Sequence, residues 1–192
     1  MKKWPKWLRR LCWLVGSFAT ALLLLWAVMS ALMLHWVARP PALGEKQAIT
    51  QLAPQARGDR MYLGKNWLGQ REGLPVLYLT GTPFEMGYAN GVLTSKLIHR
   101  QEETVLEMLR KVAPFRWTQF LIKFLLVYKN RHLPEQIIPE YQLEILCLSV
   151  GCPDVHPETG PYYHRILSYH GAQDISYMLM NSPLTRRGCT AF

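Results

Sequence analysis

The sequence predicts an α+β protein that is predominantly helical and begins with a transmembrane helix. Three patterns support this class: one long uncharged run, short strand-like segments up to residue 80, and proline-separated helical segments from residue 83 onward. Apolar residues make up 49% of the 192 positions and charged residues 18%. These fractions exclude a disordered tail and a polytopic membrane protein.

The net charge of +9 is concentrated at the N-terminus. Five basic residues precede the apolar run: Lys2, Lys3, Lys6, Arg9 and Arg10. Without these five, the 22 basic residues fall to 17 against 13 acidic ones, a net charge of +4. The rest of the chain therefore lacks the excess of charge that a nucleic-acid-binding face needs, and no nucleic-acid partner is predicted.

Residues 11–38 contain no Lys, Arg, Asp or Glu and predict a single-pass signal anchor. As a helix, this run exceeds the ~30 Å hydrocarbon core of a bilayer, and it exceeds the roughly 7–15 apolar residues of a cleavable signal. The positive charges in residues 1–10 place that segment in the cytoplasm. The expected location is the inner (cytoplasmic) membrane, with the following residues in the periplasm or outside the cell.

Residues 39–60 predict a linker, and residues 61–192 predict the folded region. Pro40 and Pro41 end the membrane helix, and no periodic apolar pattern follows before residue 60. Residues 61–63 and 66–73 are expected to form a short strand and a turn, and residues 75–80, followed at once by Gly81, are the clearest strand.

A helix is predicted from Pro83 to about Val112. Thr82 is the N-cap and Glu85 the third helical residue, which together form a capping box. Gly87 and Gly91 each cost ~1 kcal/mol of helix propensity, which a chain tolerates where another backbone approaches closely. This small-residue stripe either faces a catalytic layer or packs tightly against another helix, and packing is the favoured interpretation.

Three further helices are expected at 115–131, at 139–150 and from 162 to about 181. Gly151 should stop the second of these, and residues 151–161 should form a loop. Segment 115–131 is too short to cross a membrane, so it is either buried or lies on the bilayer surface. A final strand is expected from Arg187.

The cysteines allow two interpretations. Cys147 and Cys152 either form a disulfide in an oxidising compartment, or one is buried in a helix while the other is free in a loop. A zinc site would combine them with three histidines, His156, His164 and His170. Because the C-x-x-C spacing of a zinc knuckle is missing, no metal or other cofactor is predicted.

His170 and Asp174 lie four residues apart, so they share a helix face, and Tyr169 is beside them. A His–Asp pair can act as a base and its orienting group, but no serine is placed to complete a triad. A structural hydrogen-bonded pair is therefore the favoured interpretation.

The segment Gly188-Cys189-Thr190 has the residues that autocatalytic cleavage requires. The Cys189 thiol would attack the carbonyl of Gly188, and water would cleave the resulting thioester. Glycine leaves that carbonyl accessible and permits the strained backbone of the shift. The freed α-amine, with a reference pKa near ~8, would then serve as the general base for the thiol.

Two motifs in this order resemble a known family. The segment GTPFEMGYANG (residues 81–91) resembles the G-x-P-x-E-x-G-x-x-x-G segment of the cysteine Ntn hydrolases related to acyl-coenzyme A:isopenicillin N acyltransferase. The ending GCTAF (188–192) resembles the autocleavage site of that family. The segments NWL (66–68) and YHGAQD (169–174) resemble its membrane-anchored bacterial branch.

The resemblance implies an αββα sandwich made of a leader (α) chain and a catalytic (β) chain, with Cys189 as the nucleophile. The family's chemistry is cleavage or transfer of acyl groups at amide bonds, so small-molecule or lipid amides are the expected substrates. The oxyanion-hole residues would lie downstream of Phe192. Residues 61–192 are therefore expected to be a leader region that is inactive without the missing catalytic part.

An alternative class needs no catalysis. The same residues also fit a membrane-anchored helical module that presents the apolar segment 115–131 to lipid or to a protein partner. The two hypotheses differ in whether the bond between Gly188 and Cys189 is cleaved.

Overall fold

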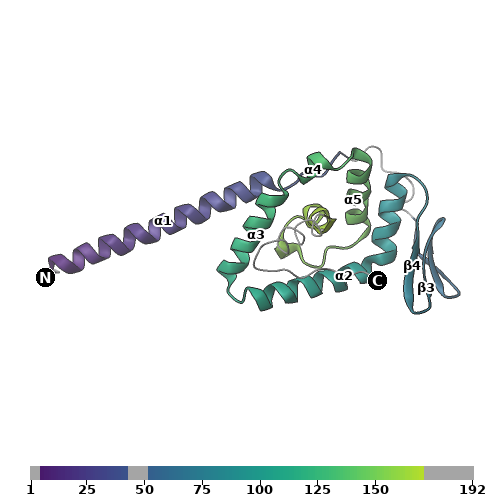
Figure 1. Cartoon of the computed structure of the whole chain (residues 1–192), viewed down its shortest axis with the longest axis horizontal. Coiled ribbons are helices and arrows are strands. Elements are labelled where there is room, and N and C mark those ends of the chain that lie inside the picture. Colours follow the sequence, from purple (N-terminus) through teal and green to yellow (C-terminus); the bar gives the residue numbers. More distant parts are fainter. Residues whose placement is uncertain (1–4, 43–51, 171–192) are drawn as a thin grey trace, which may run out of the picture.

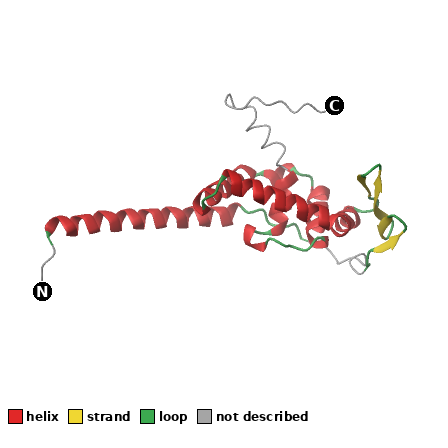
Figure 2. Ribbon diagram, turned by 90° about the horizontal axis from the view of Figure 1, so that it is seen from below, coloured by secondary structure: helices red, strands yellow, loops and turns green. Residues whose placement is uncertain are grey.

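The computed structural model describes residues 5–42 and 52–170, which are mostly helical with one small antiparallel sheet (Figure 1). The first helix extends away from a helical body, and the sheet lies at the opposite end of the molecule (Figure 2). The predominantly helical α+β class is therefore confirmed. Asp174, the strand expected from Arg187 and the segment around Cys189 lie outside the described residues.

Helix α1 spans Lys6–Trp36 and is long and apolar enough to cross a membrane. None of its most apolar window is buried in the protein, unlike the core helix of a soluble domain. Ala38, expected at the end of the span, lies instead in the protein core at 8% exposure. Its backbone N–H donates a hydrogen bond to Nδ1 of His164 over 3.1 Å, which fixes the end of α1 to the body.

The sheet is a four-stranded meander in the order β1-β2-β3-β4. The strands are β1 (Gln55–Arg57), β2 (Arg60–Leu63), β3 (Asn66–Arg71) and β4 (Leu74–Tyr78). Gly58, Gly64 and Gly73 have φ near +60° to +80° in the connecting turns, a region that favours glycine. Strand β1 and the start of β2 fall within residues 39–60, so the sheet begins earlier than the expected linker allows.

Helix α2 (Pro83–Val112) has the predicted bounds and the predicted capping box. The Thr82 N–H donates to Glu85 Oε2 over 2.8 Å, and the Glu85 N–H donates to Thr82 Oγ1 over 3.3 Å. The Thr82 N–H and the Thr82 hydroxyl, which also donates to Glu85 Oε2, lower the pKa of Glu85. The first turns of α2 pack on the sheet through Leu63, Ala89 and Leu93.

Helix α5 (Pro139–Gly151) lies directly against the glycines of α2. A Cβ at Gly87 would collide with the carbonyl oxygen of Glu144, and a Cβ at Gly91 with that of Leu148. In the opposite direction, a Cβ at Gly151 would lie 2.5 Å from the carbonyl oxygen of Tyr88. The favoured interpretation of the stripe, close helix packing, is therefore correct. Helix α5 ends at Gly151, within one residue of the expected end, and Gly151 also takes part in this contact.

The remaining elements close a frame around a central helix (Figure 1). They are α3 (Arg116–Asn130), the short α4 (Leu133–Gln136), which was not predicted, and a 3₁₀ turn at Pro157–Thr159. The central helix is described over residues 162–170 and appears yellow-green inside α2, α3 and α5. Its residues Tyr163, Ile166 and Leu167 form the main core with α5 and Ala38.

Alanine at Gly91 should destabilise the protein, although alanine favours an open helix by ~1 kcal/mol over glycine. Overpacking against the Leu148 carbonyl should lower the free energy of unfolding by about 1–3 kcal/mol. Thermal unfolding of the detergent-solubilised chain measures the effect. Gly16→Ala is the matched control, because no heavy atom lies within 4 Å of a Cβ there. Equal stability of Gly91→Ala and Gly16→Ala would contradict the close packing.

Acid should weaken the attachment of α1 to the body. Burial lowers the pKa of His164 below its ordinary value of 6.5, so the folded state favours the neutral ring, whose Nδ1 accepts from Ala38. The unfolded chain takes up a proton as pH falls below 6.5 and the folded chain does not, so stability is complete above that pH and declines below it.

His164→Asn tests this pH dependence, because the asparagine oxygen accepts a hydrogen bond without titrating. The drop in Tm between pH 7.5 and 5.5 should be larger for the wild type than for His164→Asn. Each protein is compared with itself at two pH values, so the pH-independent loss of stability caused by the smaller asparagine side chain cancels. An equal drop in both proteins would show that His164 does not cause the acid sensitivity.

Candidate functional site

The described part of the predicted site lies beside a hollow of about 270 Å³ between α2, α5 and the 162–170 helix. Tyr169 and His170 line it, together with Asn90 and Gln101 of α2 and Leu148 of α5. Residue 170 is also the last described residue before the segment that carries Gly188, Cys189 and Thr190. Of the predicted site, only Tyr169 and His170 are therefore described beside the hollow, and nothing places Cys189 relative to it.

His170 is bound to its own helix. Its Nδ1 lies 2.8 Å from the carbonyl oxygen of Ile166, so Nδ1–H donates and Nε2 carries the lone pair of the neutral ring. The expected partner, Asp174, is outside the described residues, so the His–Asp pair stays a prediction. The observed bond orients the ring and leaves Nε2 as its acceptor.

Tyr169 belongs to a buried polar cluster centred on Glu102 of α2. Glu102 is 1% exposed, and its Oε1 accepts from the Tyr169 hydroxyl over 3.2 Å and from Arg165 Nε over 3.3 Å. Because a buried carboxylate is costly without partners, these bonds fix the 162–170 helix against α2. Tyr169 therefore has a structural partner in this protein.

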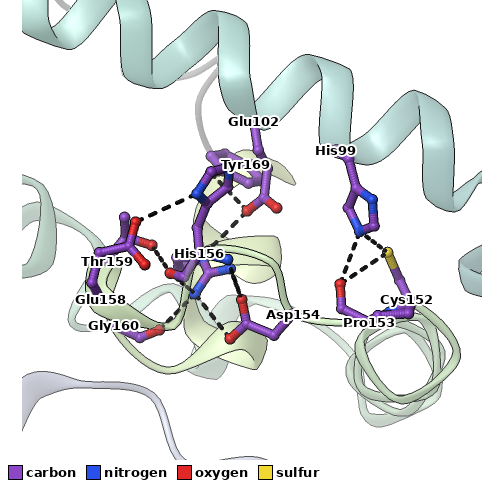
Figure 3. Close-up of polar contacts among 11 residues, drawn as sticks. His99, Glu102, Cys152, Pro153, Asp154, His156, Glu158, Thr159, Gly160 and Tyr169 are labelled. Carbon is purple, nitrogen blue, oxygen red and sulfur yellow. Dashed lines mark hydrogen bonds and ion pairs between the residues drawn. The ribbon is translucent and has the colours of Figure 1, made fainter.

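The other end of Arg165 binds the loop before the helix, and Figure 3 labels its partners there, Asp154, His156 and Gly160. It donates to Asp154 Oδ1 over 2.6 Å and to the carbonyl oxygens of His156 and Gly160 over 3.0 and 2.7 Å. The hydrogen bond from Arg165 lowers the pKa of Asp154. Burial alone would lower the pKa of Arg165, but its carboxylate partners raise it, so the guanidinium stays charged. We call Glu102, Asp154, Arg165 and Tyr169 the Arg165 cluster.

Cys152 and His99 lie close together beside the Arg165 cluster without forming a nucleophilic pair. His99 Nε2 lies 2.8 Å from the carbonyl oxygen of Pro153 and 3.4 Å from Cys152 Sγ (Figure 3). Since Nε2–H donates to that carbonyl, it has no lone pair to accept the thiol proton. Burial raises the pKa of Cys152, and the carboxylates of Glu102 and Asp154 raise it further. The thiol is therefore inert at neutral pH.

Cys147 and Cys152 are both free and both buried, so the disulfide interpretation is wrong. The alternative is confirmed: Cys147 is buried within α5, and Cys152 is free just after the helix as its C-cap, where it is 2% exposed. Burial raises the pKa of Cys147 to about 11. Within residues 5–42 and 52–170, no group of three or more His, Cys, Asp or Glu is placed to hold a metal ion.

The three histidines of the hypothetical zinc site have separate partners. His164 accepts from Ala38, His170 donates to Ile166, and His156 Nδ1 lies 3.4 Å from Glu158. The chemistry that the described site provides is therefore positioning. The Arg165 cluster holds the 162–170 helix, and polar groups of the hollow lie beside His170, the last residue described in that helix.

Comparisons of the chain with protein-family models, with characterised proteins and with solved structures return no match. The resemblance to cysteine Ntn hydrolases therefore stays a prediction from the two motifs and their order in the chain. The fold and site define a coarser class: a mostly helical protein with a small antiparallel sheet and a membrane-compatible N-terminal helix.

Of the four residues of the Arg165 cluster, only Tyr169 was predicted from the sequence as a site residue. The residues on either side of Glu102 in α2 are exposed, and Asp154 lies in a loop rich in proline and glycine. The helix periodicity of α2 was the one signal that could have indicated that Glu102 is buried. Glu102 lies eleven residues after Gly91, which places it on the same face of α2 after three turns.

Glu102→Gln should lower the free energy of unfolding by roughly 1–3 kcal/mol, because the charge opposite buried Arg165 is lost. Glu103→Gln, at the exposed neighbouring position, is the matched control and should stay within about 0.5 kcal/mol of wild type. Urea unfolding of the full chain in detergent measures both. Equal effects of the two variants would show that the Arg165 cluster does not stabilise the fold.

Proposed function

We propose that this chain is the membrane-anchored leader region, with the nucleophile, of an autoprocessing cysteine Ntn amidohydrolase or acyltransferase. The observation that carries the proposal is the ordered pair of motifs, GTPFEMGYANG at residues 81–91 and Gly188-Cys189-Thr190. Its substrates would be amide-linked acyl groups in small molecules or lipids, and Cys189 would be the catalytic residue.

The geometry of the first motif supports the proposal. Thr82 and Glu85 begin α2 with a complete capping box, and Gly87 and Gly91 bring α5 into backbone contact. Each fixed position of the motif therefore has a structural task in the leader. Such a motif builds a rigid layer and contains no catalytic group itself, which agrees with placing the nucleophile elsewhere.

The Arg165 cluster supports the second half of the proposal. It fixes the 162–170 helix, and autocleavage needs the segment that follows to be held in one strained conformation. Among the described thiols, Cys12 is exposed on α1, whereas Cys147 and Cys152 are buried, and burial raises the pKa of both. Neither competes with Cys189 for the role of nucleophile.

The proposed reaction has two stages. In processing, Cys189 Sγ attacks the carbonyl carbon of Gly188, the Gly188–Cys189 amide bond breaks, and the amine takes the thiol proton. Water then hydrolyses the thioester, which releases the carboxylate of Gly188 and restores the thiol. In turnover, the Cys189 α-amine accepts the thiol proton, and the thiolate attacks the carbonyl carbon of a substrate amide. The C–N bond breaks, and the substrate amine leaves with the proton from the α-ammonium. Water or an acceptor amine then takes the acyl group from the thioester and restores the thiol.

We place the enzyme in the inner membrane with α1 as a single span. The basic residues before α1 favour a cytoplasmic N-terminus, so the described body and residues 171–192 would face the periplasm or the exterior. By the resemblance, the oxyanion-hole donors and the rest of the αββα sandwich belong to sequence downstream of Phe192.

Expression of the full-length gene product with a C-terminal tag tests the proposal. The wild type should yield a tagged fragment whose first residue is Cys189, identified by N-terminal sequencing and intact mass. Cys189→Ala should remain uncut, because the attacking thiol is gone. Cys12→Ala, which removes an exposed thiol of α1, is the matched control and should be cut like the wild type. A wild type that stays intact, or a Cys189→Ala variant cut at the same bond, would refute the proposal.

A further inference from the structure

Helix α3 exposes an apolar stripe. Trp117, Leu121 and Leu125 lie four residues apart on one face and are 67%, 43% and 51% exposed. Phe115, just before the helix, is 61% exposed, and Val112 at the end of α2 is 73% exposed. A contiguous exposed patch of this kind marks an interaction surface or a membrane contact.

A second face of α3 packs along the C-terminal part of α1. The Phe120 ring lies 6.2 Å from the ring of Trp26, and the Phe124 ring lies 5.9 Å from that of Trp36. Tyr128 also contacts Trp36, with ring centroids 5.3 Å apart. The N-terminal part of α3 therefore lies beside Trp26, farther back along α1 than its C-terminal part beside Trp36, and α3 is inclined to α1 (Figure 1).

These contacts set the depth of α3 relative to a membrane that α1 crosses. Trp26 lies ten residues before Trp36, about 15 Å along a helix axis. That distance is about half of the ~30 Å hydrocarbon core. If Trp36 lies at the interface, where indoles are favoured, the beginning of α3 reaches below the headgroups.

Two further residues of α3, Val127 and Asn130, are buried at 8% and 7% exposure. Val127 lies seven residues after Phe120 and so shares the face that contacts α1. With that face against α1, Trp117, Leu121 and Leu125 remain exposed. Figure 1 shows α3 as the wall of the frame on the side toward α1, with the sheet at the far end.

The charges of the segment suit a lipid surface. Residues 115–131 carry four basic side chains and no acidic ones: Arg116, Lys123, Lys129 and Arg131. Long basic side chains extend to the headgroups while their stems cover apolar surface, and anionic lipids attract them.

We propose that α3 is a second membrane-binding element, with Trp117, Leu121 and Leu125 inserted into the bilayer leaflet on the side of the folded body. The occupant of this face is phospholipid, because the stripe continues the apolar surface of α1 at the same depth. The body would then sit directly on the membrane, held by α1 and α3 together. This inference does not depend on cleavage at Cys189.

Photo-cross-linking in vesicles tests the inference on the full chain. Benzoylphenylalanine replaces Leu121 or Leu125, and the protein is reconstituted into phosphatidylethanolamine–phosphatidylglycerol vesicles. The matched control is the same residue at Tyr78, which is 49% exposed on β4 at the far end of the body. After irradiation, mass spectrometry counts the lipid adducts on each peptide.

Lipid adducts several-fold more abundant at 121 and 125 than at 78 would support the inference. Adduct levels no higher than at 78 would overturn it, and so would adducts only to a second copy of the chain or to another protein. Because both tested positions are exposed and are labelled separately, a folding defect at one leaves the other as the test.

Discussion

The backbone contact between α2 and α5 is the constraint on which the rest of the structure depends. Gly87 and Gly91 allow the carbonyl oxygens of Glu144 and Leu148 to approach α2, and Gly151 allows the approach of α2 to α5 in return. A side chain at any of the three would separate the helices. The N-terminal half of α2 then packs on the sheet, and α5 supplies the main core against the 162–170 helix. One contact thus joins the two hydrophobic cores.

Two sets of buried polar contacts attach the 162–170 helix and the end of α1 to these packed helices. The Arg165 cluster attaches the 162–170 helix to α2, and His164 holds Ala38 just after α1. Residue 170, from which the chain continues toward Cys189, and the end of the membrane-compatible helix are therefore fixed to the same rigid body.

Local chemistry made α2 predictable, because Thr82, Pro83 and Glu85 specify its start within four residues. The glycine spacing likewise indicated a close contact, though not its partner. The long-range hydrogen-bonded pairs could not be predicted from the sequence, because Arg165 and Glu102 are 63 positions apart and Ala38 and His164 are 126 apart. Strand β1 was missed because all three of its residues are exposed and show no alternation. The disulfide was left open because spacing alone does not orient Cys147, which points into the core from within α5.

Hydrogen exchange on the full chain in lipid vesicles tests the central claim most directly, because amides that open only on global unfolding exchange by one common, slowest process. The glycine contact predicts that Gly87–Thr94 of α2 and Ile145–Gly151 of α5 share this process and lose protection together when denaturant is added. If α5 exchanges independently and much faster than α2, the two helices are not held together by the backbone contact, and the account is wrong.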